Sequence, residues 1–77
     1  MIIGMKKKLR DNQFLMQVGS KIRKYRKAKN LSLQVVADAI GMNISNLSFL
    51  ERGKTNPHLL TLKAISEVLD VDVTDFI

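Results

Sequence analysis

The sequence predicts a small all-α protein, a compact bundle of five helices, and three observations support this prediction. The chain has 77 residues, which is the size of one domain with one core. Hydrophobic residues make up 45% of it, enough to favour a packed core over disorder. Apolar residues recur at steps of three and four along the chain, as helices require, and no segment alternates convincingly as a strand does.

The first helix is expected over residues 13–29. Asp11 or Asn12 can cap its start, and Asn30 can end it because asparagine tolerates the left-handed conformation. The apolar stripe of this helix consists of Phe14, Leu15, Val18, Ile22 and Tyr25.

Residues 1–12 precede this helix and are assigned to a basic, flexible N-terminal arm, which leaves residues 13–77 as the folded domain. The basic run from Lys6 to Arg10 can lie along DNA. It can equally be a solvated tail, or an extension upstream of a natural start at Met5. The sequence leaves these three interpretations open.

Two short helices are expected in the middle of the chain. Ser32 can cap the first of them, which Gly41 ends, and Asn43 can cap the second, which covers about residues 44–52 and ends at Gly53. The inward residues of the first are Leu33, Val36, Ala37 and Ile40. A glycine in the short link permits the positive φ of a tight turn, and this spacing fits a helix-turn-helix, whose second helix enters the DNA major groove.

The last part of the chain predicts two further helices. The apolar residues Leu62, Ile65, Val68 and Leu69 mark the fourth. Asp72 can cap a short fifth helix, with Asp75 in the capping-box position three residues later. This completes the five-helix bundle.

The composition excludes several classes of site. The chain contains no cysteine, so it forms neither a disulfide nor a thiolate metal site, and a single histidine, His58, cannot build a histidine-rich metal cage. Its longest apolar runs have about three residues, whereas a membrane span needs roughly twenty. The N-terminus is apolar first and basic afterwards, the reverse of a secretory signal. We expect a soluble, cytoplasmic protein that needs no metal and no cofactor.

Positive charge is concentrated in the first half of the chain. Of the net charge of +6, residues 1–30 carry +9, with ten Lys or Arg side chains and one acid, and residues 31–77 carry −3. This asymmetry favours a polyanion as the partner of one face, either nucleic acid or an anionic membrane. The alternative is a first helix that is merely well solvated, and charge alone does not decide between them.

A set of spaced residues closely resembles the phage-repressor (Cro/C1-type) helix-turn-helix family over roughly residues 18–77. Its most specific part is the turn Glu51-Arg52-Gly53, followed by Asn56-Pro57. The other matching residues are Ile22, Arg23, Arg26, Leu31, Ser32, Ala37, Gly41, Ser48, Leu50, Lys54, Thr61, Leu62, Ile65, Leu69 and Val71. The resemblance implies a five-helix DNA-binding fold, usually homodimeric, that regulates transcription at paired half-sites.

The sequence departs from the family pattern at three positions. Leu33 stands where the family usually has a glutamine that holds a phosphate, so one backbone contact is weakened. Ile44 and Phe49 stand where polar or basic residues are common. The surface expected to face DNA is therefore unusually apolar.

Rotation of about 100° per residue places the side chains of the third helix. Leu47, Leu50 and Glu51 share the inward side, and the remaining positions face outward or lie on the flanks. The predicted base contacts are Ile44, Ser45, Asn46 and Phe49. Asparagine can pair with adenine, serine with several bases, and apolar side chains with thymine methyl groups. Ile44 can instead pack in the first helical turn, and Phe49 can contact protein rather than DNA.

The predicted phosphate contacts are Ser32, Asn43, Ser48, Arg52, Lys54, Thr55 and Asn56. The resemblance implies that the residues at the end of the third helix and in the loop after it contact phosphates. Ser32 and Asn43 stand at helix starts, where backbone N–H groups favour phosphate, although simple capping is the alternative for both. The family pattern and the inward position of Glu51 also predict an ion pair between Arg26 and Glu51.

We expect a sequence-specific regulator, a repressor, that binds double-stranded DNA through the helix at residues 44–52. The alternative is a degenerate helix-turn-helix that acts as a protein-interaction module, such as an antitoxin-like or co-regulator subunit. No spacing of residues suggests catalysis, so an enzyme is not expected. A homodimer is expected, because one such domain makes few base contacts, and Val73 and Ile77 are its predicted interface. Phe76 is expected in the core.

Overall fold

The computed structural model describes the backbone of residues 3–77 and the side chains of residues 11–77. Within this part, four α-helices are followed by one 3₁₀ helix: α1 (Ile3–Ala28), α2 (Leu33–Ile40), α3 (Ile44–Glu51), α4 (Leu59–Leu69) and η1 (Val73–Phe76). No strand is present in the described residues, so the all-α prediction is confirmed. The prediction of five α-helices is wrong, because the last element is a single turn closed by the i→i+3 bond from the N–H of Asp75 to the carbonyl of Asp72.

The first helix begins ten residues earlier than predicted, at Ile3 rather than residue 13. Asp11 and Asn12 therefore lie inside α1 and do not cap it. The residues before them are mainly Lys, Leu, Met and Arg, which favour helix and include no helix breaker except Gly4. Asn30 has a φ of 57°, as expected for the residue that ends this helix.

The division between an arm at residues 1–12 and a domain at residues 13–77 stays a prediction. α1 crosses this boundary, and the continuity of a helix does not say whether its two parts move together. The basic side chains of residues 6–10 lie outside those that the structure describes.

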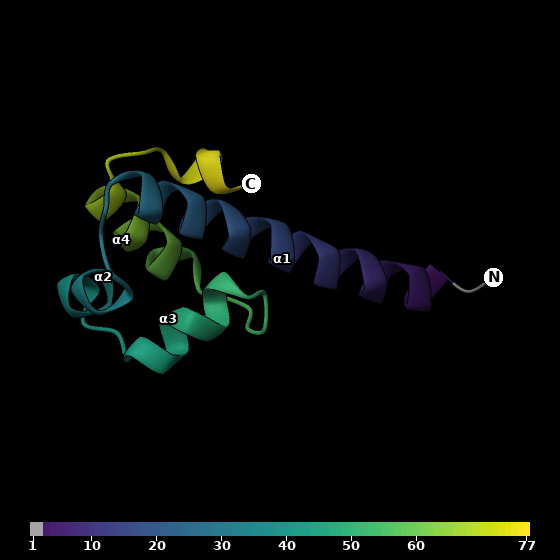
Figure 1. Ribbon diagram of the computed structural model, residues 1–77. Coiled ribbons are helices and arrows are strands. Elements are labelled where there is room, and N and C mark those ends of the chain that lie inside the picture. Colours follow the sequence, from purple (N-terminus) through teal and green to yellow (C-terminus); the bar gives the residue numbers. More distant parts are fainter. Residues whose placement is uncertain (1–2) are drawn as a thin grey trace.

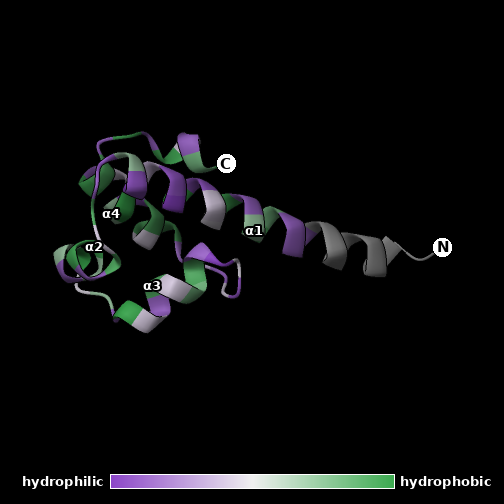
Figure 2. Ribbon diagram, in the orientation of Figure 1, coloured by the Kyte–Doolittle hydropathy of each residue, from purple (hydrophilic) through white to green (hydrophobic). Residues whose placement is uncertain are grey.

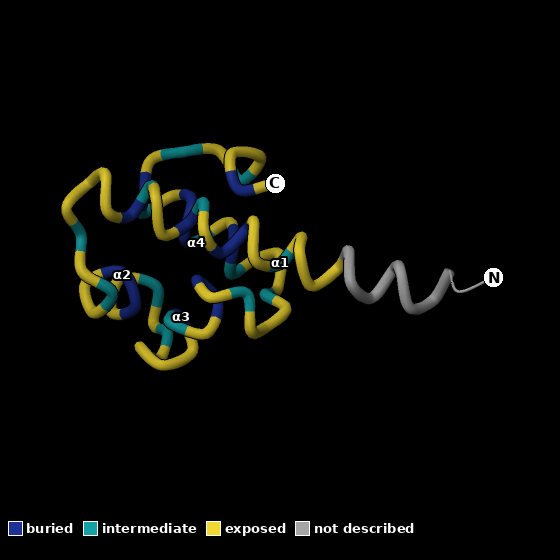
Figure 3. The backbone as a smooth tube through the Cα atoms, turned by 45° about the vertical axis from the view of Figure 1, so that its right-hand side comes forward, coloured by how far each residue is buried: buried dark blue, intermediate teal, exposed yellow. Residues whose placement is uncertain are grey.

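The helices pack around one core. α1 contacts α3, α4 and η1, whereas α2 contacts α3 and α4, and Figure 1 shows η1 and α3 on opposite sides of α1. The buried hydrophobic residues are Val18, Ile22, Val36, Ala37, Leu47, Leu50, Leu62, Ile65, Leu69 and Phe76. Figure 3 shows that every element supplies buried positions between the helices. Figure 2 shows hydrophobic residues on α2, α3 and α4 and a mixed pattern on the described part of α1.

The expected apolar stripe of α1 is only partly buried. Val18 and Ile22 are in the core and Tyr25 packs against it, but 45% of the Phe14 side chain is exposed. The neighbouring Leu15 is half-buried, and Met16, which Gly53 approaches, is 58% exposed. The stripe is therefore buried at Val18 and Ile22 and exposed at Phe14.

Two glycines allow α1 to pass directly against the end of α3. A Cβ atom on Gly19 would lie 2.3 Å from the carbonyl oxygen of Leu50 and 2.5 Å from that of Glu51. Gly53 has a φ of +71°, and a Cβ atom there would lie 2.6 Å from the Cα of Met16. This approach sets the position of α3 relative to α1.

None of the helices in the described part of the chain combines the length and the apolar character needed to cross a membrane.

Candidate nucleic-acid interface

The α2–turn–α3 unit has the caps and the turn that its sequence predicts. The Ser32 hydroxyl accepts a hydrogen bond from the N–H of Val35 at 3.1 Å, and the Asn43 side-chain oxygen accepts one from the N–H of Ser45 at 2.8 Å. Gly41 adopts a φ of 68° at the end of α2. Two eight-residue helices are thus joined by a three-residue turn.

α3 buries one side and exposes the other. Leu47, Leu50 and Glu51 are buried, in agreement with the rotation expected from the sequence. The four predicted base contacts, Ile44, Ser45, Asn46 and Phe49, are all exposed. The outer surface of α3 is therefore open to a partner.

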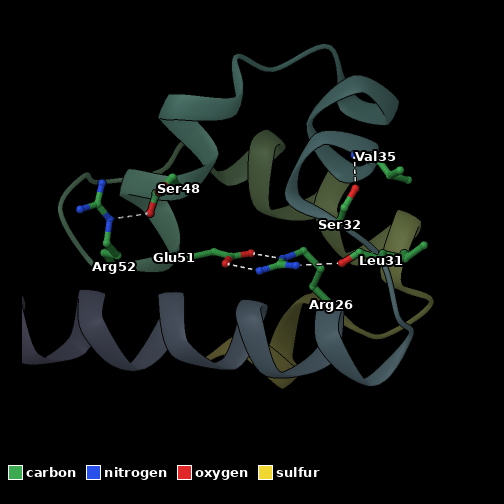
Figure 4. Close-up of polar contacts among 7 residues, drawn as sticks. All are labelled: Arg26, Leu31, Ser32, Val35, Ser48, Glu51 and Arg52. Carbon is green, nitrogen blue, oxygen red and sulfur yellow. Dashed lines mark hydrogen bonds and ion pairs between the residues drawn. The ribbon is translucent and has the colours of Figure 1, made fainter.

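A buried ion pair fixes α3 to α1. The Arg26 guanidinium donates from Nε to Oε2 of Glu51 at 2.6 Å and from Nη2 to Oε1 at 2.9 Å (Figure 4). Nη1 of Arg26 donates to the carbonyl of Leu31 at 2.8 Å. The hydrogen bond with Glu51 raises the pKa of Arg26 above its usual value, although burial acts to lower it. The structure thus contains the ion pair that the sequence predicts.

Residues on the outer surface of α3 line a groove of about 290 Å³. Its lining residues are Leu33, Ile44, Ser45, Ser48, Phe49 and Arg52. The Arg52 guanidinium lies over the Phe49 ring, 5.0 Å from its centroid, and its Nε donates to the carbonyl of Ser48 at 3.4 Å. Phe49 remains 41% exposed. The surface is apolar with a cation held at its edge.

The contact between Phe49 and Arg52 was not predicted from the sequence. Residues three apart are neighbours on a helix, so their spacing was a usable signal. Stacking explains how an aromatic ring is tolerated at an exposed position, because the guanidinium covers part of one face and is attracted to it.

The structure does not bring all predicted base contacts together. Asn46 lies on the other flank of α3, where it lines a groove of about 170 Å³ with Thr55 and Asn56. Asn43 and Asn46 also line a groove of about 380 Å³ between the turn and α4. The predicted contacts therefore form two groups, one on each flank of α3.

The remaining predicted phosphate contacts lie at the ends of helices and in the loop. Lys54, Thr55 and Asn56 are exposed in the loop between α3 and α4. Ser32 is exposed at the start of α2, and Ser48 is half-buried on α3. Ser32 and Asn43 each accept a capping hydrogen bond through the side-chain oxygen, and each still has its donor group for a phosphate oxygen.

A short helix, a tight turn and a second helix with an open outer surface define a helix-turn-helix protein. Residues 22–76 match the family model described as Helix-turn-helix. The chain belongs to this family and is of the Cro/C1 type, which confirms the resemblance drawn from the sequence.

The chain is similar to the HTH-type transcriptional regulator SinR of Bacillus subtilis, with 44% identity over 57 residues, which cover 73% of this chain and 51% of SinR. The chain is also similar to the crystal structure of SinR, the master regulator for biofilm formation, in complex with DNA. The TM-score is 0.72 and the identity 42%, over 77% of this chain and 95% of the SinR chain in that structure. The restriction-modification controller protein C.AhdI of Aeromonas hydrophila has a TM-score of 0.79 and 28% identity, over 82% of this chain and 96% of that one. The chain spans about half the length of SinR.

Proposed function

We propose that this chain is a sequence-specific regulator of transcription that binds duplex DNA by inserting α3 into the major groove. The observation that carries the proposal is the exposed outer surface of α3, on a helix whose other side is held by Leu47, Leu50 and the pair of Arg26 and Glu51. A rigidly held helix with a free side suits direct readout of bases. The likeness to SinR, whose structure was solved in complex with DNA, supports the same function.

The two flanks of α3 have different roles in this proposal. Ile44, Ser45 and Phe49 pack on or bond to base edges, with the apolar side chains against thymine methyl groups. Asn46 reads a base from the other flank. The phosphate contacts, which fix position and carry no sequence information, are Ser32, Asn43, Ser48, Arg52, Lys54, Thr55 and Asn56.

The alternative function, a protein-interaction module, draws its support from the apolar side chains on α3. Phe49 is partly covered by Arg52, which reduces the apolar area left for a protein. The likeness to named transcriptional regulators also favours DNA as the partner. We propose further that the protein acts as a repressor, forms a homodimer through Val73 and Ile77, and needs no metal or cofactor.

The test is binding to a random-sequence duplex, and to a duplex selected from such a pool, at several salt concentrations. If about five phosphates are neutralised per protomer, the slope of log K against log salt is about −4 to −5 for one protomer and about −9 for a homodimer. Selected DNA is expected to bind far more tightly than random DNA. No binding at low salt, or binding that does not change with salt, would favour the protein-interaction module.

A further inference from the structure

A second groove, of about 210 Å³, continues the outer surface of α3 towards α1. It is lined by Arg23, Arg26, Leu33, Ser48, Glu51 and Arg52. It shares Leu33, Ser48 and Arg52 with the groove that holds the predicted base contacts. The two grooves therefore form one continuous surface.

The ion pair of Arg26 and Glu51, which lines this second groove, has no net charge. Glu51 uses both carboxylate oxygens for Arg26, and Arg26 uses Nε, Nη1 and Nη2 for Glu51 and for the carbonyl of Leu31. The charges of this pair therefore compensate each other. Glu51 makes no ion pair with Arg23 or Arg52.

Two positive charges remain uncompensated in the groove, those of Arg23 and Arg52. Both residues are exposed, and among the side chains of residues 11–77 the only ion pair is that of Arg26 with Glu51. Arg23 comes from α1 and Arg52 from the end of α3, so the two guanidinium groups belong to different elements that meet at this groove. Such a pair attracts an anion whose oxygens can accept from both.

The position of Arg23 follows from the close packing of α1 on α3. Gly19, which touches the carbonyls of Leu50 and Glu51, precedes Arg23 by four residues, so Arg23 lies one turn further along the same side of α1. It is thus placed beside the flank of α3. When a helix lies in the major groove, a sugar–phosphate strand borders the groove on each side of it.

We propose that Arg23 and Arg52 together hold one phosphate of the DNA backbone beside the major groove, with the Ser48 hydroxyl as a third donor. The proposal rests on the proposed function, since it names a contact of the same DNA. Arg23 thereby becomes a positioning residue supplied by α1, outside the helix-turn-helix itself. It sets the depth and register of α3 and does not read a base.

The experiment uses the full chain and a duplex selected with the unchanged protein. Arg23→Gln removes the charge and keeps a polar side chain at an exposed position, so folding should be retained, and circular dichroism checks this. Lys24→Gln is the matched control, because Lys24 is an exposed residue of the same helix, its ammonium group lies over the Tyr25 ring, and it lines neither groove at α3. Arg23→Gln is expected to weaken binding to this duplex about tenfold at 0.1 M salt, because a hydrogen bond to a charged group usually contributes about this much. It should also flatten the slope of log K against log salt by about 0.9 for each bound protomer.

A methylphosphonate scan of the same duplex locates the phosphate. Replacing one particular phosphate linkage by the neutral methylphosphonate should weaken DNA binding by the unchanged protein about tenfold. The same replacement should have little effect on DNA binding by the Arg23→Gln or Arg52→Gln variant. If Arg23→Gln alters affinity and slope no more than Lys24→Gln does, or if no single linkage depends on both arginines, the phosphate site is disproved while DNA binding stands. If the unchanged protein binds no duplex, both this site and the proposed function are disproved.

Discussion

Arg26 of α1 and Glu51 of α3 are joined by two hydrogen bonds, of 2.6 Å and 2.9 Å, inside the bundle. Only 7% and 4% of the two side chains are exposed. Because Arg26 also donates to the carbonyl of Leu31, one guanidinium connects α1, the segment before α2 and the end of α3. This pair therefore fixes the helix-turn-helix on α1, which supplies Arg23.

Replacing Arg26 with methionine leaves the Glu51 carboxylate buried without its partner. Loss of one member of a buried pair costs about 3–5 kcal/mol, a large part of the stability of a domain of this size. We expect Arg26→Met to lower the free energy of unfolding by about this amount in urea denaturation. The double variant with Arg26→Met and Glu51→Leu should be much more stable than the single one. A single variant as stable as the original protein would contradict this account.

Replacing Gly19 with alanine places a methyl group where the carbonyls of Leu50 and Glu51 lie. Helix propensity alone would make this change stabilising by about 1 kcal/mol. The clash must instead push α1 and α3 apart, at a cost of about 1–3 kcal/mol. The free energy of unfolding should therefore fall, and DNA affinity should fall with it because α3 is displaced.

The control for Gly19→Ala is Ser20→Ala, an exposed position on the same helix. This change should leave the free energy of unfolding unchanged or raise it slightly. If Gly19→Ala is as stable as Ser20→Ala, the close packing of α1 on α3 does not limit the structure.

The central helices could be predicted from the sequence because their signals are local. Ser32, Gly41 and Asn43 cap or end helices through their own side chains or backbone freedom, so each position reveals its role without knowledge of the rest of the fold. The inward side of α3 also follows from periodicity alone. These features were sufficient to predict α2 and α3 to within one residue.

The start of α1 was missed although local helix propensity favours it, whereas the other missed features depend on packing. Phe14 lies on the apolar stripe of α1, yet it is 45% exposed although the neighbouring Leu15 is half-buried. The close approach at Gly19 has no signal in a single sequence, since glycine inside a helix has several explanations. The role inferred for Arg23 depends on this approach, and it could not be separated by sequence from the other basic residues of α1.

Phe49 should contribute to binding more than to folding, whereas Leu47 on the same helix should do the opposite. Phe49 is 41% exposed and Leu47 is fully buried. We expect Phe49→Ala to lower the free energy of unfolding by under about 1 kcal/mol and to weaken binding to a selected duplex by about tenfold or more. Leu47→Ala should cost about 2–5 kcal/mol of stability.

A duplex in which single thymines are replaced by deoxyuridine tests the contact proposed for Phe49. Loss of the methyl group should weaken binding of the unchanged protein at one position and have no further effect on Phe49→Ala. Equal losses in both proteins would show that Phe49 does not meet a thymine methyl group.

The C-terminal segment offers a testable homodimer interface. Phe76 is fully buried and its ring centroid lies 6.1 Å from that of Tyr25, so it belongs to the core as expected. Ile77 is 57% exposed, while Val73 is only half-buried against the core and lines a groove of about 450 Å³ with Val71. If a second copy covers this surface, Ile77→Asp places a charge in an apolar contact and should weaken the dimer at least tenfold in sedimentation at micromolar concentration.

Leu60→Asp is the matched control, because Leu60 is 77% exposed at the start of α4 and receives the same change from apolar to acidic. It should leave the dimer intact. Ile77→Asp should also weaken binding to a two-half-site duplex much more than binding to a single half-site, because only the former depends on pairing of two protomers. A dimer that survives Ile77→Asp but not Leu60→Asp would place the interface on α4. A monomer both alone and on DNA would show that one copy of this helix-turn-helix is sufficient for binding.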